Sequence, residues 1–248
     1  MDLTPSMASP NLTAPTDKKV RWVPLESNPE VMTRLLHCLG VPDTWAFSDV
    51  YGLDPELLGF VPQPVQALIL LFPISPAYEE RYHREQDALP ANPPLDPAGP
   101  FFIRQTIGNA CGTMAVLHAV ANLREKLQVN PDGPLARFVA ETQELDPMRR
   151  ARVLEQASDI AEAHRDSANA GQTAAPAADA HIDLHFVCLV RHGDRLFELD
   201  GRKKAPVDHG PSAADSFLTD AARVAREFMK ADPDNLQFSV VSLGPVPE

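Results

Sequence analysis

The chain has 248 residues, a length that suits one domain or two small ones. It carries 22 Lys and Arg residues against 34 Asp and Glu residues, and the formal charge of −12 argues against nucleic acid as a partner. No apolar run approaches the roughly 20 residues that a membrane-spanning helix needs, so no membrane partner is expected either.

The start of the chain and its cysteines indicate the cellular setting. Residues 1–19 are rich in Pro, Ser and Thr and lack the apolar stretch of a secretory signal, so we expect a disordered tail before one domain at 20–248. Three cysteines are an odd and sparse set, typical of a reducing compartment rather than of a disulfide scaffold. We expect a monomer in the cytoplasm, with the nucleus as a second location.

The first part of the domain contains two predicted strands and a helix. Residues 21–25 have the pattern of a short edge strand that contains a proline. Ser27 and Glu30 have capping-box spacing, Pro29 suits the first turn and Gly40 supplies the stop, which predicts a helix between them. Residues 65–72 (VQALILLF) form an almost unbroken apolar run, which favours a strand buried on both faces.

The middle of the chain combines a proline-rich segment with a core helix. Prolines at five positions in 86–100 exclude regular structure there. Residues 101–106 then resume as a strand, and 110–126 form a helix that is apolar nearly all round, as a helix inside a core would be. Asn109 is a good N-cap for it. A strongly charged helix is predicted from 146 to about 164.

The last part of the chain begins with a segment at 163–181 that is poor in large apolar residues. Such a segment is typical of a lid, a binding loop or disorder. Strands at 182–190 and 195–200 flank a hairpin turn, and an amphipathic helix at 212–230 and a strand at 236–243 follow. The elements together predict a mixed α/β (α+β) domain with a core helix and a late run of strands.

Cys111 is the cysteine whose position suggests chemistry. It falls in the first turn of the predicted core helix, where the helix dipole and unpaired N–H groups lower the pKa of a thiol. The alternative is a small buried apolar residue, which is the usual fate of a free cysteine. Cys38 and Cys188 lie within a helix and a buried strand, where that alternative is favoured.

A thiolate nucleophile needs a base, and His185 is the best-placed histidine. It interrupts a strand of the core, and Asp200 ends the next strand, so pairing of the two strands would put a carboxylate beside the imidazole. Gln105 precedes a strand–turn–helix connection that can fold its amide back beside the sulfur, as an oxyanion donor with the Cys111 N–H. Each also has a structural reading, as a core histidine, a turn aspartate and a polar strand end. The chain order Gln, Cys, His, Asp is that of papain-like cysteine hydrolases.

Metal and cofactor chemistry find no support in the sequence. Cys111, Cys188, His181 and His185 lack the spacing of a zinc site. No glycine-rich phosphate loop occurs. We therefore expect neither a metal nor a cofactor.

Five segments resemble the ubiquitin carboxyl-terminal hydrolase family, especially its short L-type isozymes. They are 105–113 (QTIGNACGT), 183–186 (DLHF), 196–203 (LFELDGRK), 22–31 (WVPLESNPEV) and 49–58 (DVYGLDPELL). The resemblance covers residues 21 to about 243 in the same order. It implies a papain-like fold with a central antiparallel sheet flanked by helices and a knotted backbone.

The resemblance also implies roles for four residues and a substrate. Cys111 is the expected nucleophile, His185 the general base and acid, Asp200 the residue that orients His185, and Gln105 the oxyanion donor. The substrate would be the C-terminal glycine of ubiquitin, cleaved through a thioester, with NEDD8 as a second candidate. The segment at 163–181 corresponds to the family's crossover loop, which favours small adducts and short extensions. The expected substrate-binding residues are Pro24, Leu25, Glu26, Ser27, Asn28, Pro29, Asp49, Ala168, Asn169, Ala170, Gly171, Gln172 and Thr173.

Two other functions stay open at this point. One is a ubiquitin-binding module without relevant catalysis, which the four chemical residues argue against. The other is an acyltransferase that uses the same Cys-His-Asp order, which the local motifs do not favour. Release of a fluorophore from a ubiquitin C-terminal amide separates the first from a hydrolase, and acyl transfer from a thioester donor would reveal the second.

Overall fold

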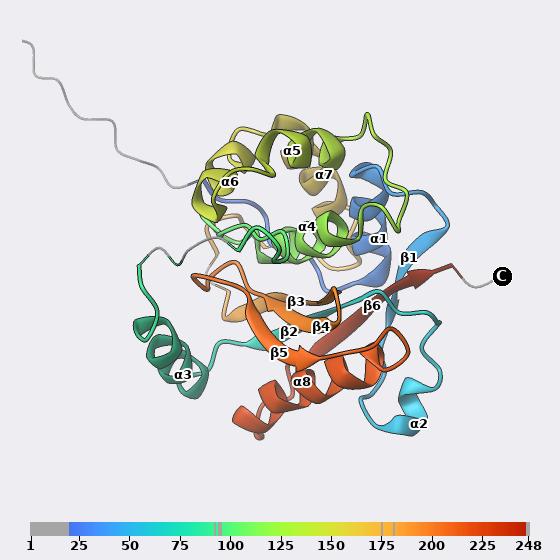
Figure 1. Ribbon diagram of the computed structural model, residues 1–248, viewed down its shortest axis with the longest axis vertical. Coiled ribbons are helices and arrows are strands. Elements are labelled where there is room, and N and C mark those ends of the chain that lie inside the picture. Colours follow the sequence, from blue (N-terminus) through green and yellow to red (C-terminus); the bar gives the residue numbers. More distant parts are fainter. Residues whose placement is uncertain (1–19, 92, 94–95, 175, 181, 247–248) are drawn as a thin grey trace, which may run out of the picture.

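The chain folds around a six-stranded antiparallel sheet that lies between two layers of helices (Figure 1). The computed structural model describes residues 20–91, 93, 96–174, 176–180 and 182–246, so the predicted tail at 1–19 lies outside the described residues. The strands, in spatial order, are β1 (Trp45–Asp49), β6 (Ser239–Pro245), β2 (Ala67–Pro73), β3 (Leu184–His192), β4 (Arg195–Leu199) and β5 (Val207–Pro211). The helices are α1 (Pro29–Cys38), α2 (Pro55–Leu58), α3 (Pro76–Asp87), α4 (Cys111–Leu123), α5 (Pro134–Thr142), α6 (Pro147–Leu154), α7 (Ser158–Ala168) and α8 (Phe217–Ala231). The predicted mixed α/β class with a central antiparallel sheet is confirmed.

The central strands β2 and β3 are buried on both faces. Ile69 and its cross-strand partner Cys188 point into the core that α1, α4 and α5 complete. The next pair, Leu70 and Val187, packs on the opposite face against α8. Because successive side chains of a strand face opposite sides, an apolar run without alternation is what two helical layers require.

Helix α4 is the core helix that the sequence predicts. It packs directly on β3, and its residues 112–121 are all buried. Helix α8 covers the opposite face of the sheet with an apolar stripe that includes Phe217, Val224 and Phe228. The sheet and α4 therefore form a rigid frame, and Cys111 stands at the first residue of that helix.

The predicted strand at 101–106 is wrong, because this segment is extended but pairs with no strand. Two of its N–H groups bind side chains of α4, and those of Arg104 and Gln105 bind the backbone carbonyls of Pro147 and Gly201. Phe101 N donates to Asn122 Oδ1 at 2.7 Å, and Ile103 N donates to His118 Nε2 at 3.0 Å. The segment therefore lies along the core helix and not in the sheet.

Two further boundaries differ from the prediction. The single helix expected from 146 to about 164 is two helices, α6 and α7, separated by a turn at 155–157. The structureless segment expected from 163 begins later, because 163–168 form the end of α7 and are packed against the core. The irregular part that remains is 169–183, of which residues 175 and 181 lie outside the described residues.

Near the start of the domain, Asn28 rather than Ser27 caps α1, with its Oδ1 accepting from Glu30 N at 2.8 Å. The expected strand at 21–25 reduces to one parallel bridge between Arg21 and Gly108. The proline-rich segment starts only after α3, which includes residues 86 and 87. Five elements were not predicted, namely the 12-residue helix α3 and the shorter β1, α2, α5 and β5. The other predicted strands and helices are present, with ends shifted by a few residues.

Candidate active site

Cys111 occupies the first position of α4, as predicted, but Asn109 is not its cap. The N-cap position is Ala110, which makes no side-chain cap hydrogen bond. Asn109 adopts a left-handed conformation with φ 60°, and its side chain points to another segment. The thiol thus sits at the positive end of a helix whose first N–H groups have no side-chain cap, an environment that stabilises a thiolate.

His185 and Asp200 are in direct contact, as strand pairing predicts. Cys188 pairs with Leu199, so Asp200 follows β4 at the diagonal of His185 on the neighbouring strand. His185 Nε2 lies 2.6 Å from Asp200 Oδ1, and the two residues are only 3% and 1% exposed. Because Nε2 is engaged by Asp200, Nδ1 is the nitrogen that remains for the sulfur of Cys111.

The charges of this buried group stabilise one another. Burial lowers the pKa of His185, but the Asp200 carboxylate and the Cys111 sulfur outweigh it and raise the pKa to about 10. Burial raises the pKa of Asp200, and the charge and hydrogen bond of His185 lower it to about 2. For Cys111, burial raises the thiol pKa, but the hydrogen bond and charge of His185 bring it below its ordinary value. The arrangement therefore favours a thiolate–imidazolium pair held by a carboxylate.

Gln105 lies in the extended segment before α4 and is fixed by the turn after β4. Its backbone N–H donates to Gly201 O at 2.8 Å, and a Cβ at Gly201 would lie 2.8 Å from the Gln105 Cβ, so the close approach requires glycine. Its Nε2 donates to Ile107 O at 3.1 Å. An amide has two N–H groups, so one of them remains for another acceptor. Gln105, Cys111 and His185 border one cavity of about 320 Å³.

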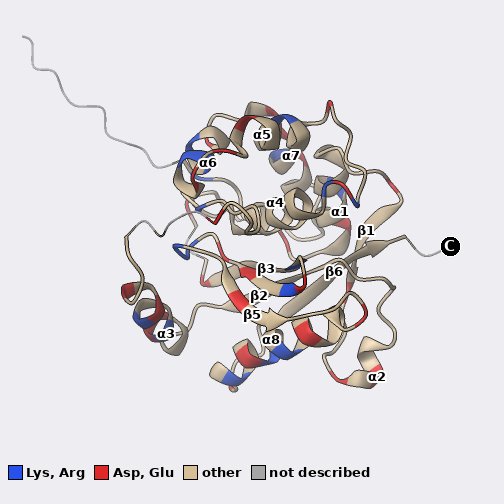
Figure 2. Ribbon diagram, in the orientation of Figure 1, with Lys and Arg blue, Asp and Glu red and all other residues tan. Residues whose placement is uncertain are grey.

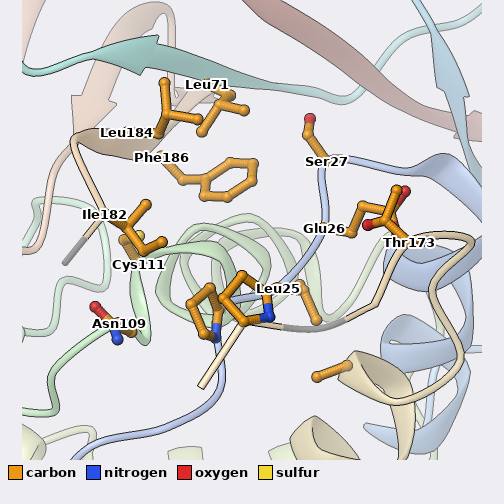
Figure 3. A pocket seen from close by; sticks show the side chains of 13 residues that line it. Leu25, Glu26, Ser27, Leu71, Asn109, Cys111, Thr173, Ile182, Leu184 and Phe186 are labelled. Carbon is orange, nitrogen blue, oxygen red and sulfur yellow. The ribbon is translucent and has the colours of Figure 1, made fainter. Parts of the chain in front are cut away.

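A second cavity of about 350 Å³ also borders Cys111 (Figure 3). Its walls are mainly apolar. They include Leu71 of β2, Leu184 and Phe186 of β3, and Ile182, which precedes β3. Cys111 borders both cavities, together with Asn109, Ile182 and Leu184, so the two cavities adjoin at the cysteine.

The expected substrate-binding residues divide between this cavity and other places. Pro24, Leu25, Glu26, Ser27, Ala168 and Thr173 line the cavity beside Cys111. Asn28 caps α1, Pro29 and Ala170 border a separate surface hollow, and Asn169 caps the end of α7. Gly171 lies against the Glu26 carboxylate, and Gln172 is exposed. Asp49 borders a different cavity with Tyr51 and Phe238, away from Cys111.

The segment that follows α7 is fastened at both of its ends. Near its start, Thr173 N lies 3.4 Å from Glu26 Oε2. Near its end, Asn109 Nδ2 donates to Ala178 O at 2.9 Å and approaches Ala180 O at 3.4 Å. The segment therefore crosses the cavity between two anchors, one at Glu26 and one at Asn109, directly before α4.

Two residues of this site were missed by sequence reasoning. The anchoring role of Asn109 has a signal, since Asn tolerates positive φ better than most residues, but its partners are carbonyl groups far along the chain. Tyr78 donates from its hydroxyl to Asp200 Oδ2 at 3.0 Å, and nothing in its local sequence indicates that contact.

No group of three or more His, Cys, Asp or Glu side chains within the described residues could hold a metal ion. Across the same part of the chain, no helix has both the length and the apolar character to cross a membrane.

The chain is similar to several known proteins over most of its length. Residues 22–230 match the family described as "Ubiquitin carboxyl-terminal hydrolase, family 1". A "Ubiquitin carboxyl-terminal hydrolase" of Aplysia californica is 45% identical over 219 residues, covering 86% of this chain and 97% of the relative. One of Drosophila melanogaster is 43% identical over 223 residues, covering 90% and 96%. The rat (Rattus norvegicus) "Ubiquitin carboxyl-terminal hydrolase isozyme L1" is 41% identical over 220 residues, covering 89% and 96%.

Among solved structures, the catalytic domain of Trichinella spiralis UCH37 bound to ubiquitin vinyl methyl ester superposes with a TM-score of 0.71. The match covers 91% of this chain and 96% of that one at 24% sequence identity, and it shows a shared fold. The family match and the curated relatives together confirm the resemblance seen in the sequence. The chain therefore belongs to the ubiquitin carboxyl-terminal hydrolase family, a family of cysteine peptidases.

Proposed function

We propose that this protein is a thiol-dependent ubiquitinyl hydrolase that releases adducts from the C-terminal glycine of ubiquitin through a Cys-His-Asp triad. The observation that carries the proposal is the buried chain of contacts from Asp200 through His185 to Cys111 at a helix N-terminus. A binding module would have no use for a thiol whose pKa is lowered by a buried imidazolium. Family membership supports the same conclusion.

In the first half of the reaction, the Cys111 thiolate attacks the carbonyl carbon of the C-terminal glycine. A carbon–sulfur bond forms, and the carbonyl electron pair moves to oxygen. The free N–H of Gln105 and the backbone N–H of Cys111 would stabilise that oxyanion. As the carbon–nitrogen bond breaks, His185 gives its Nδ1 proton to the leaving amine, and a thioester remains.

In the second half, water hydrolyses the thioester. His185, now neutral, takes a proton from the attacking water, and the sulfur leaves as the thiolate. Asp200 holds Nε2 throughout, which keeps Nδ1 directed at the reacting atoms. The site then returns to its starting thiolate–imidazolium pair, because the proton taken from water stays on Nδ1.

The two cavities suggest how substrate lies across the sulfur. The general acid has to face the leaving group, and His185 borders the smaller cavity with Gln105, so we assign the leaving group to that side. The C-terminal tail of ubiquitin would then occupy the apolar cavity between Leu25 and the irregular segment at 169–183, which we call the crossover segment. The crossover segment is anchored at Thr173 and at Ala178, so the substrate has to pass between this segment and the rest of the domain. Such a passage favours small adducts and short extensions over folded leaving groups.

The charge of the chain fits such a substrate. The formal charge of −12 suits the basic tail of ubiquitin, and charge complementarity of this kind raises the association rate more than the affinity. NEDD8 is a second candidate substrate. We expect turnover of both modifiers. The comparison uses ubiquitin and NEDD8 that each carry the same fluorogenic amide at the C-terminus, and the kcat/KM values of the two substrates measure the preference.

The test is release of a fluorophore from a ubiquitin C-terminal amide. We expect turnover by the wild type, none by Cys111→Ala, and normal turnover by Cys38→Ala, since Cys38 is exposed and remote from the triad. Gln105→Ala should lower kcat by roughly 100-fold or more if its amide serves the oxyanion. Cys111→Ala should still bind ubiquitin, as measured by titration.

A ubiquitin with an electrophile at its C-terminus locates the nucleophile independently. It should label Cys111 and leave Cys38 and Cys188 free, as read by peptide mass spectrometry. Binding of ubiquitin without turnover or labelling would instead favour the non-catalytic module and overturn the proposal. Leaving-group size is tested with ubiquitin extended by a few residues against ubiquitin fused to a folded domain, and we expect the short extension to be cleaved faster.

A further inference from the structure

The Asp200 carboxylate has donors on both of its oxygens. Oδ1 accepts from His185 Nε2 at 2.6 Å and from Arg202 N at 2.9 Å. Oδ2 accepts from the Tyr78 hydroxyl at 3.0 Å. Tyr78 is 4% exposed and Asp200 1%, so the two groups meet inside the protein. Tyr78 is thus the donor that the structure provides for the oxygen facing away from His185.

The Tyr78 hydroxyl keeps its proton in this position and donates a hydrogen bond to Asp200. Burial raises its pKa above the ordinary value, and the negative charge of Asp200 raises it further, so the proton stays on the hydroxyl. Its ring is held between aromatic side chains of two other elements. The Phe72 ring of β2 lies 4.8 Å away and the Phe228 ring of α8 6.5 Å away, measured between ring centroids. The core therefore fixes where the hydroxyl points.

Tyr78 belongs to α3, a helix that contacts the turn directly after Asp200. Helix α3 lies at the edge of the molecule and carries many charged residues (Figures 1 and 2). Much of its polar surface nevertheless contacts residues 202–204. The contacts are Tyr82 Oη to Arg202 O at 2.8 Å, Arg202 to Glu79 at 2.6 Å, Lys203 Nζ to Glu85 at 3.2 Å and Lys204 N to Gln86 Oε1 at 2.7 Å.

The base of the same turn is held from the sheet side by a buried ion pair. Lys203 Nζ lies 2.8 Å from Glu198 Oε1, and both residues are 2% exposed. His209 Nε2 approaches the other Glu198 oxygen at 3.0 Å. The turn is therefore fixed from two sides, but only Tyr78, among the side chains of α3, reaches the carboxylate of Asp200 itself.

We propose that Tyr78 is a positioning residue for the hydrolysis, because it fixes the rotation of the Asp200 carboxylate and so keeps Oδ1 aligned with His185. The proposal rests on the hydrolase activity proposed above. Without the hydroxyl, Oδ2 would be a buried carboxylate oxygen without a donor, which is a costly state. The carboxylate would rotate toward other N–H groups, and His185 would lose the contact that directs Nδ1 at the sulfur.

The chain offers a matched pair of variants for the test. Tyr78→Phe and Tyr82→Phe each remove one hydroxyl from the same helix and one hydrogen bond to the same turn, but only the first bond ends on Asp200. We expect Tyr78→Phe to lower kcat about tenfold, as the loss of one hydrogen bond to a charged group predicts, with KM unchanged. Tyr82→Phe should stay within about twofold of the wild type.

A spectroscopic readout separates positioning from a loss of stability. In protein with 15N-labelled histidine, the resonance of the His185 Nε2 proton should move in Tyr78→Phe and stay in place in Tyr82→Phe. Thermal unfolding midpoints are measured for both, so that only folded proteins are compared. Equal loss of kcat in the two variants, or an unmoved resonance in Tyr78→Phe, would overturn the proposal. Should the wild type show no turnover, the hydrolase assignment fails while the resonance still decides the role of Tyr78.

Discussion

Replacing His185 with glutamine should make Cys111 behave like Cys188. Cys188 is buried and Cys111 is partly buried, yet burial alone acts on Cys188 and raises its pKa, whereas the pKa of Cys111 lies below its ordinary value. The difference is the hydrogen bond and the charge of His185, which are the main causes that oppose burial at Cys111. Glutamine keeps a hydrogen-bonding side chain of similar length but carries no charge.

The size of the effect follows from these causes. In His185→Gln, burial becomes the largest remaining influence and moves the thiol pKa above its reference of 9.0. At pH 7, a thiol with a pKa above 9.0 is ionised in fewer than about one molecule in a hundred. In the wild type the Cys111 thiolate forms at lower pH than in the variant. It stays paired with the His185 imidazolium up to a pH of about 10, where His185 loses its proton. His185→Gln should therefore raise the pKa of Cys111, so that the thiol ionises only at more alkaline pH.

The assay is alkylation by iodoacetamide between pH 5 and 10, followed by mass spectrometry of the peptide of each cysteine. Exposed Cys38 serves as the internal reference and should react alike in both proteins, while buried Cys188 should react in neither. The pH midpoint of Cys111 alkylation should lie below 9.0 in the wild type and move toward alkaline pH in His185→Gln. The reasoning is refuted if the midpoint is the same in the two proteins.

Three further changes test the surroundings of the site. Lys203→Met leaves Glu198 buried with His209 as its remaining ion partner. The free energy of unfolding, measured by urea titration, should fall by about 3–5 kcal/mol. A loss below about 1 kcal/mol would contradict the reasoning from the buried ion pair. Asn109→Ala removes the anchor at the end of the crossover segment, so limited proteolysis between residues 169 and 183 should accelerate, and an unchanged cleavage rate would count against that anchor. Gly171→Ala places a Cβ 2.3 Å from the Glu26 carboxylate, which has to move away. The amide of Thr173 should then exchange its hydrogen faster than in the wild type, and equal exchange would contradict the first anchor.

The sequence predicted the central elements well because their patterns are local. An apolar run without alternation identified β2, and apolar residues on every side identified α4, since both are enclosed by other elements. The contact between His185 and Asp200 followed from a hairpin whose turn is readable at Gly193. What these predictions share is that the decisive residues lie close together along the chain.

The errors have the opposite origin. Residues 101–106 look like a strand, but two of their N–H groups bind His118 and Asn122 of a helix that comes later in the chain. Asn109 looks like a cap, but its amide reaches carbonyl groups about seventy residues away. Tyr78 reaches Asp200 across an even larger separation. Such contacts depend on the packed tertiary structure, which no local pattern encodes.

The distribution of the site along the chain has a consequence for synthesis in the cell. The segments that carry Tyr78, Gln105 and Cys111 leave the ribosome before those that carry His185 and Asp200. Until the later strands dock, Cys111 lacks the His185 side chain that lowers the pKa of its thiol. The reactivity of this sulfur therefore depends on strands that are synthesised late, and its appearance would report that the sheet around His185 has formed.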